Sequence, residues 1–252
     1  MTMSDRIIIE KKDNKTVYRE GDIIVKEFIR EHPKSYVYNE AYIHACVEET
    51  GLPIPKIISV TPAENGGLAL AMAYVEGKTL DEQMKESPEK TDELLETFID
   101  IQMEVNKRRV LTIRHTLEKM RTAVSQLTEI DASTRYELMQ RLQGMKRHTK
   151  LCHGDFVPSN VILRNDGTWC VLDWAHASQG NAGADAATTY MRFSLEDPEI
   201  AERYLKMYCR KADMAVQYIQ QWMPIVAAAQ LLKGVEGEEK LLREWISVAE
   251  YQ

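Results

Sequence analysis

The sequence lacks the features that would assign it to a secreted, zinc-binding or nucleic-acid-binding class. Its four cysteines show no Cys-x-x-Cys spacing, so we expect free thiols in a reducing compartment. It also lacks an excess of basic residues, because 32 Lys and Arg stand against 39 Asp and Glu, for a net charge of −7. An acidic chain is a poor partner for nucleic acid or an anionic membrane surface, since phosphate binding needs basic patches.

Long hydrophobic runs are absent too. The apolar run Ile7–Ile9 is followed at once by charged residues and is too short for the core of a signal peptide. The most apolar later stretch, residues 225–232, contains Gln230 and is typical of a buried helix, not of a membrane span. We therefore expect a cytoplasmic globular protein. Its 252 residues, 44% hydrophobic and 28% charged, suffice for one large domain or two small lobes.

The periodicity of apolar residues changes along the chain. Up to residue 75 it predicts short strands and one helix at 35–50, capped by Ser35 and ended by Gly51. Helical periodicity then predominates, at residues 92–108, 114–127, 132–148 and from about 183 onward, with a strand-like interval at 151–173. The sequence predicts an α+β fold of two lobes. Residues 1–75 would form a small lobe of sheet with one helix, and residues 76–252 a larger, mainly helical lobe.

A predicted β-hairpin over residues 161–172 is the most informative segment. Asp166-Gly167 between two apolar runs is typical of a two-residue turn, and that turn would place Asn160 opposite Asp173. Side chains opposite each other on antiparallel strands lie about 5 Å apart at Cβ. An amide oxygen and a carboxylate would then meet at one end of the hairpin. Such oxygen ligands suit Mg²⁺, which usually binds one or two protein groups together with substrate phosphates.

A further carboxylate precedes this hairpin. Asp155 lies five residues before Asn160, in a loop stiffened by Pro158, and would be available there as a base. Taken singly, Asp and Asn at strand ends are more often turn formers or caps. Asp155, Asn160 and Asp173 in this register, with His153 beside them, favour a functional site.

A resemblance to a known family rests on these residues. From residue 153 the chain reads His-Gly-Asp-Phe-Val-Pro-Ser-Asn, and from residue 172 it reads Leu-Asp-Trp. The specific spacing His-Gly-Asp-x-x-x-x-Asn resembles the catalytic and metal-binding loops of the aminoglycoside phosphotransferase and choline kinase family, small-molecule relatives of protein kinases. Extending over most of the chain, the resemblance implies a protein-kinase-like fold with an antiparallel sheet in the small lobe. It implies that Asp155 accepts the substrate hydroxyl proton, that Asn160 and Asp173 hold Mg²⁺, and that Asp185 supports the loop structurally.

The same resemblance implies where a nucleotide binds. Lys26 has the apolar strand context of the kinase lysine that contacts the α- and β-phosphates, and Glu40 in the following helix resembles its ion-pair partner. Residues 72–77 resemble the hinge, where the backbone of Ala73 and Val75 would pair with the edge of the base. The sequence does not distinguish ATP from GTP at this position.

One segment departs from the family pattern. The loop expected to cover the phosphates, residues 10–15, contains no glycine, whereas protein kinases use a glycine-rich loop there. Either charged side chains or the backbone of Asn14 would have to substitute, or the loop would hold phosphate weakly.

These observations predict a phosphotransferase that moves the γ-phosphate of ATP or GTP to a hydroxyl of a small molecule, with Mg²⁺ as cofactor. Nothing in the sequence selects among aminoglycosides, choline, thiamine and sugars as acceptors. Two alternatives stay open: a non-catalytic, pseudokinase-like binding or scaffolding module, and a metal-dependent hydrolase built on His153, Asp155 and Asp173. His176, close after Asp173, would either contact substrate or cap the loop.

Overall fold

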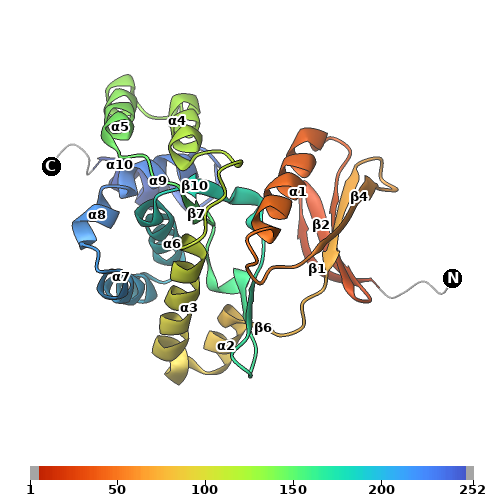
Figure 1. The fold of residues 1–252 in the computed structure, drawn as a ribbon. Helices are drawn as coiled ribbons and strands as arrows, with labels where there is room; N and C mark the ends of the chain where they lie inside the picture. Colours follow the sequence, from red (N-terminus) through yellow and green to blue (C-terminus); the bar gives the residue numbers. More distant parts are fainter. Residues whose placement is uncertain (1–5, 248–252) are drawn as a thin grey trace. The chain divides into compact units, whose positions relative to one another are not determined.

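A computed structural model of the chain describes residues 6–247 (Figure 1). The described residues divide into two compact units, which we treat separately. The N-terminal unit ends at Gln83 and also takes in Ser159–His176, whereas the helical unit comprises Met84–Pro158 and continues from Ala177. The lobe boundaries predicted from the sequence, residues 1–75 and 76–252, stay a prediction. No helix within residues 6–247 is long and apolar enough to cross a membrane.

The N-terminal unit is built on an antiparallel sheet. Its strands are β1 (Ile7–Lys12), β2 (Lys15–Glu20), β3 (Ile23–Phe28), β4 (Ile57–Pro62) and β5 (Leu68–Ala73). They lie in the order β1-β2-β3-β5-β4, and every neighbouring pair is antiparallel. The predicted hairpin around residues 20–22 is confirmed, because Glu20 pairs with Ile23 and Gly21 takes the left-handed φ of 60° that the tight turn requires.

One helix, α1 (Lys34–Glu48), covers one face of this sheet (Figure 1). Phe28 and Leu70 of the sheet form a buried apolar cluster with Val37 of the helix. The predicted helix is confirmed, and so is the stop at Gly51: the helix ends at Glu48, and Gly51 closes the following turn with a φ of 75° and an amide hydrogen donated to the Glu48 carbonyl oxygen. The predicted cap at Ser35 is wrong. The helix starts one residue earlier, at Lys34, after Pro33.

The hairpin that follows residues 153–160 (called the catalytic-loop sequence, after the loop that they resemble) consists of β8 (Val161–Leu163) and β9 (Trp169–Val171), with β6 (Lys78–Thr79) alongside β8. Its predicted register is wrong by one residue, since Val161 pairs with Val171 and the connecting loop has three residues, not two. Gly167 takes a φ of 81° as the third residue of that loop. The Asp166 carboxylate accepts from the Thr168 amide at 2.9 Å and fixes the longer turn.

The helical unit contains most of the remaining elements. They are α2 (Leu80–Glu86), which begins in the N-terminal unit, α3 (Thr91–Asn106), α4 (Thr116–Gln126), α5 (Ala132–Gly144), β7 (Lys150–Cys152), β10 (Ser178–Gly180), α6 (Ala182–Glu196), α7 (Pro198–Ala212), α8 (Val216–Gln220), α9 (Met223–Leu231) and α10 (Glu239–Ser247). The strands β7 and β10 pair antiparallel. Helix α9 is almost entirely buried, Gln230 included, as its predominantly apolar sequence predicts.

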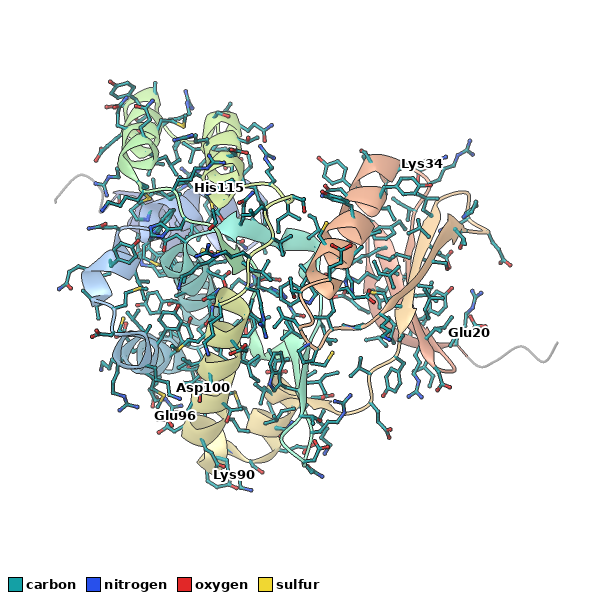
Figure 2. The ribbon with its side chains drawn as sticks, viewed as in Figure 1. Glu20, Lys34, Lys90, Glu96, Asp100 and His115 are labelled. Carbon is teal, nitrogen blue, oxygen red and sulfur yellow. The ribbon has the colours of Figure 1, made fainter. Side chains whose placement is uncertain are left out.

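Helix α3 is anchored by an aromatic core and by ion pairs at its surface. The Phe98 ring lies 4.6 Å from that of Phe156, centroid to centroid, so the helix packs against the catalytic-loop sequence. On its outer side Glu96 and Asp100 (Figure 2) pair with Arg210 and Lys211 of α7, at 3.0 and 2.7 Å. Exposed pairs of this kind contribute little stability, so we assign the anchoring mainly to the aromatic contact.

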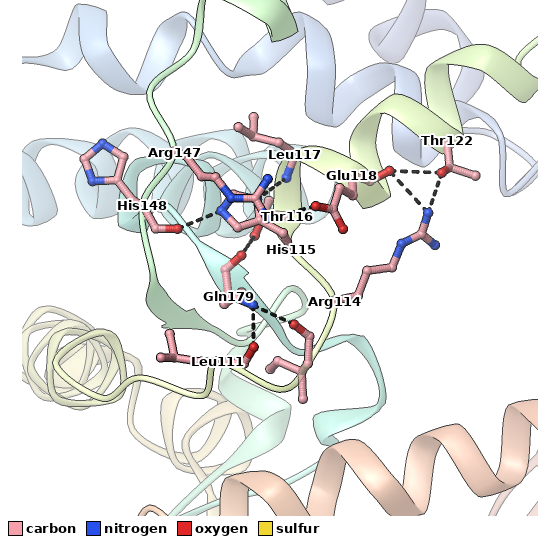
Figure 3. Close-up of polar contacts among 11 residues, drawn as sticks. Leu111, Arg114, His115, Thr116, Leu117, Glu118, Thr122, Arg147, His148 and Gln179 are labelled. Atoms are coloured by element: carbon pink, nitrogen blue, oxygen red, sulfur yellow. Dashed lines mark hydrogen bonds and ion pairs between the residues drawn. The ribbon is translucent and has the colours of Figure 1, made fainter.

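A buried histidine fixes the start of α4 (Figure 3). Nδ1 of His115 accepts the Leu117 amide hydrogen at 3.1 Å and therefore caps the helix. The acceptor role of Nδ1 assigns the ring proton to Nε2, which donates to the His148 carbonyl oxygen at 2.8 Å. Burial lowers the pKa of His115, in agreement with a neutral ring.

Candidate functional site

The centre of the site in the N-terminal unit is a buried lysine between two carboxylates. Nζ of Lys26, on β3, lies 2.6 Å from Oε1 of Glu40 on α1 and 2.8 Å from Oδ1 of Asp173. The structure therefore brings together the lysine and the glutamate that the resemblance implied, and it adds the carboxylate predicted to bind metal.

The electrostatic balance at Lys26 favours its charged form. The lysine is only 7% exposed, and burial by itself would lower its pKa. The neighbouring carboxylates of Asp173 and Glu40 outweigh this effect and raise the pKa of Lys26 above its ordinary value. The lysine is thus a fixed cation, able to attract phosphate oxygens but not to act as a base near neutral pH.

Asp173 reaches Lys26 through an unusual backbone conformation. Its φ is 54°, in the left-handed region that few residues other than glycine adopt. The following turn, Trp174–His176, packs against α1, and the Trp174 side chain is fully buried and donates its indole hydrogen to the Val171 carbonyl oxygen. The buried tryptophan therefore holds the backbone in the strained geometry.

Asn160 and Asp173 are neighbours at the end of the hairpin, although not in the predicted way. The Leu172 amide donates to the Asn160 carbonyl oxygen at 2.8 Å, so Asn160 lies opposite Leu172 and one residue from Asp173. Successive residues of a strand point to opposite faces of the sheet. If both segments were regular strands in the observed register, the side chains of Asn160 and Asp173 would therefore lie on opposite faces. Asn160 instead ends a short 3₁₀ turn, and the left-handed Asp173 has also left the strand conformation.

The chemistry of these two residues fits Mg²⁺. An amide oxygen and a carboxylate are hard ligands, and Mg²⁺ commonly takes one or two such protein groups with phosphate oxygens. A carboxylate has about four lone-pair sites, so the contact of Asp173 with Lys26 is compatible with a cation at the same carboxylate. Within residues 6–247 no group of three or more His, Cys, Asp or Glu side chains is arranged to hold a metal.

The segment predicted as the hinge, residues 72–77, starts with the last two residues of β5 and continues beyond the strand. The Ala73 amide donates to the Lys56 carbonyl oxygen at 2.9 Å, and the Tyr74 amide donates to the Asp22 carbonyl oxygen at 2.8 Å. With its amide engaged, Ala73 would offer a base its carbonyl oxygen. Val75 lies beyond the end of the strand, outside any helix or strand.

The glycine-free segment is a tight hairpin. Lys12 pairs with Lys15, which leaves only Asp13 and Asn14 as the loop. The Asn14 carbonyl oxygen accepts the Ile29 amide hydrogen at 3.1 Å. Among residues 6–247, positive φ outside glycine occurs only at Asp173 and Asp213, so this turn has no left-handed residue to turn its amides toward an anion.

In the helical unit a buried carboxylate supports the catalytic-loop sequence. The Gly154 amide, at a φ of 79°, donates to Oδ1 of Asp185 at 2.8 Å. Oδ2 of Asp185 accepts from Asn106 at 3.1 Å, and Asn106 also donates to the Leu151 carbonyl oxygen at 2.9 Å. Asp185 is 2% exposed and lies in the first turn of α6, where a negative charge is favourable. These contacts are those of the structural residue that the resemblance implied.

Asp155 follows on the same loop with its side chain partly exposed. Its amide donates to Nδ1 of the buried His153 at 3.3 Å, and the His153 ring meets the Phe156 ring edge-on. The Phe156 carbonyl oxygen accepts from the Thr189 hydroxyl at 3.0 Å. The loop is therefore fixed from behind, which positions the Asp155 carboxylate.

Sequence reasoning missed the cation beside Asp155. Nε of Arg192, on α6, lies 3.4 Å from Oδ1 of Asp155, and the same guanidinium lies 3.8 Å from Oε1 of Glu238. One signal could have found it. Arg192 is seven residues after Asp185, which is two helical turns and hence the same face of the helix.

The chain is similar to known proteins both in sequence pattern and in fold. A sequence profile of the phosphotransferase enzyme family matches residues 6–218. No curated protein is detectably similar to the chain in sequence.

Several solved structures share the fold. A thermostable mutant of aminoglycoside phosphotransferase APH(4)-Ia, in a ternary complex with ADP and hygromycin B, has a TM-score of 0.73 at 14% identity, with 98% of this chain and 93% of that chain covered. Aminoglycoside-3'-phosphotransferase of type VIII has a TM-score of 0.66 at 17% identity, with coverages of 92% and 94%. The ADP-bound aminoglycoside phosphotransferase APH(2'')-Ib has a TM-score of 0.65 at 16% identity, with coverages of 99% and 93%.

The structural matches confirm the predicted kinase-like α+β fold, with an antiparallel sheet in one part and mainly helices in the other. The family match spans most of the chain and confirms the predicted enzyme class, a phosphotransferase acting on small molecules. The chain belongs to the phosphotransferase enzyme family.

Proposed function

We propose that this protein transfers the γ-phosphate of ATP or GTP to a hydroxyl group of a small molecule. The observation that carries the proposal is the buried contact of Lys26 with both Glu40 and Asp173, within a chain of the phosphotransferase family. The proposal divides the chain into a nucleotide-binding lobe, residues 1–75, and a catalytic and substrate-binding lobe, residues 76–252. We also propose a cytoplasmic location, because all four cysteines are free thiols.

Binding of the nucleotide is assigned to the N-terminal unit. The backbone of Ala73 and Val75 would pair with the base, and Lys26, kept charged by its carboxylates, would attract the α- and β-phosphate oxygens. Glu40 fixes the lysine, so little side-chain freedom is lost when phosphate arrives. Mg²⁺, when held by Asn160 and Asp173, neutralises charge on the phosphates.

Asp155 is the proposed base. Phosphoryl transfer needs little covalent chemistry from the protein, so its main work is to place the acceptor oxygen and receive its proton. The Asp155 carboxylate is about three-quarters buried, and its loop is anchored through Asp185 and Phe156. Arg192 beside it would limit how the carboxylate turns.

The test is nucleotide consumption by the purified protein with a panel of hydroxyl acceptors. Aminoglycosides belong on the panel because the solved relatives include aminoglycoside phosphotransferases, and choline, thiamine and sugars cover the other acceptor chemistries. Asp155→Asn should lower turnover by roughly 10²–10⁴-fold, the usual contribution of a positioned base, and leave nucleotide binding intact. Asp166→Asn is the matched control, since Asp166 is an exposed turn residue of the hairpin.

Retention of near-normal turnover by Asp155→Asn would show that this carboxylate is not the base. A non-catalytic, pseudokinase-like module is the second candidate, favoured by the glycine-free hairpin at Asp13-Asn14. It predicts no turnover with any acceptor, whereas Mg²⁺-dependent stabilisation by nucleotide together with turnover supports the kinase.

A further inference from the structure

The sheet register defines the direction in which a nucleotide would extend over the N-terminal unit. Ile23 pairs with Ala73, next to the proposed base-binding backbone, and Lys26 follows three residues later on the same strand. At a rise of 3.3–3.4 Å per residue, these two levels of the sheet are about 10 Å apart. Phe28, two residues beyond Lys26, pairs with Lys15. The chain of phosphates passing Lys26 would therefore point toward the level of Lys15.

Lys15 is on the correct face of the sheet. Val17 pairs with Lys26, and side chains of paired residues share a face. Lys15 is two residues from Val17, so it shares this face as well. Lys15 lies one strand away from β3 and two residues further along than Lys26, so the two Cα atoms are about 8 Å apart. At this separation two lysine side chains can converge on one ligand.

The neighbouring lysines differ from Lys15. Lys12, its partner across the hairpin, forms an ion pair with Glu10 at 2.7 Å. Lys11 pairs with Thr16 and therefore faces the opposite side of the sheet. Lys15 is half-buried, and no carboxylate of residues 6–247 pairs with its ammonium group.

We propose that Lys15 binds the terminal phosphates of the nucleotide and replaces the glycine-rich loop of protein kinases. The inference rests on the proposed function. The two-residue turn has neither glycine nor a left-handed residue, so it cannot turn successive amides toward a phosphate. A lysine ammonium supplies the missing donors as a point charge and needs no special backbone conformation. The phosphate contacts that backbone amides make in protein kinases would thus come from the Lys15 side chain in this protein.

The test compares Lys15→Met with Lys11→Met, which removes a lysine from the opposite face of the same hairpin. Binding of the triphosphate, diphosphate, monophosphate and nucleoside is measured by calorimetry with Mg²⁺, using whichever of ATP and GTP the wild-type protein binds more tightly. Because Lys15→Met loses a charged hydrogen bond to phosphate, the dissociation constant of its triphosphate complex should be about tenfold higher than that of the wild type, or more. Binding of the nucleoside should be unchanged, and Lys11→Met should resemble the wild type. Lys15→Arg should recover most of the affinity.

Other results would overturn the proposal. If Lys15→Met binds triphosphate as tightly as Lys11→Met, Lys15 does not contact the phosphates. If Lys15→Met weakens nucleoside and triphosphate binding equally, its effect is a general disturbance of the sheet. A wild-type protein that binds no nucleotide would refute the proposed function and this inference with it, whereas tight wild-type binding with an unaffected Lys15→Met refutes the inference alone.

Discussion

Removal of the Lys26 ammonium is the most direct test of the buried ion pairs. Lys26→Met keeps much of the apolar volume of the side chain but leaves Glu40 and Asp173 without their shared cation. The two carboxylates differ in access to water. The Glu40 side chain is 13% exposed, and that of Asp173 is 34% exposed.

The expected loss of stability follows from this difference. Removing one partner of a buried ion pair costs about 3–5 kcal/mol, because the other charge stays buried without compensation. Glu40 falls in this class, whereas Asp173 can be solvated, so its pair contributes no more than about 1 kcal/mol. We expect Lys26→Met to lower the free energy of unfolding by about 3 kcal/mol, which a typical domain with about 5–15 kcal/mol survives.

A double variant isolates the charge. Lys26→Met with Glu40→Gln removes the stranded carboxylate and should recover about half of the loss, near 1.5 kcal/mol. The free energies are measured by urea unfolding followed by circular dichroism and extrapolated to water. Lys11→Met, which changes an exposed side chain of the same sheet, is the control and should lie within about 0.5 kcal/mol of the wild type.

The pH dependence has a definite sign. Because the pKa of Lys26 is raised above its ordinary value of 10.5, its stabilisation is fully present below that value. It is lost only as the pH rises through the higher folded-state value. Titration of Lys26 should therefore cause no change, between about pH 6 and 9, in the difference in free energy of unfolding between the wild type and Lys26→Met. A penalty below about 1 kcal/mol, or one that Glu40→Gln does not reduce, would refute the reasoning.

Two further predictions concern the helical unit. For His115, whose burial lowers its pKa below the ordinary 6.5, the unfolded chain takes up a proton more readily than the folded one as the pH falls. The melting temperature of the wild type should therefore drop from about pH 8 to 5.5 by more than that of His115→Asn, which keeps a cap that does not titrate; equal drops would contradict the assigned role. Asp185→Ala removes the acceptor of Gly154 and Asn106 and should lower the free energy of unfolding by about 2–4 kcal/mol. It should also reduce turnover in the acceptor assay more than nucleotide binding measured by calorimetry, and unchanged stability and turnover would show that Asp185 does not support the loop.

The features that could be predicted from the sequence depend on local rules. The turn at Gly21 and the end of α1 at Gly51 need left-handed glycines, and their neighbours leave few alternatives. The contact between Lys26 and Glu40 could be predicted because a lysine in a strand followed by a glutamate in the next helix is the combination that protein kinases use.

The predictions that were wrong concern segments for which a local sequence rule allows two structures. Asp166-Gly167 is compatible with a two-residue turn or with the last two residues of a three-residue loop, and hydrogen bonds from Thr168 to the Asp166 carboxylate decide for the longer one. Ser35 is a good cap in isolation, but Pro33 already presets the backbone for a start at Lys34. The sequence places Arg192 on the same face of α6 as Asp185, but its contact with Asp155 depends on how α6 packs against residues 153–160, which no local rule supplies.

The left-handed backbone of Asp173 decides how mutations at this position can be interpreted. Aspartate and asparagine tolerate such a φ better than most residues, whereas alanine there would cost roughly 1–2 kcal/mol through its backbone alone. An alanine variant would change the conformation of the turn before Trp174 and the charge at the same time. Any loss of activity would then mix geometry with chemistry. Asparagine preserves the dihedral preference and removes only the charge, so at this position a conformationally matched residue is the informative substitution.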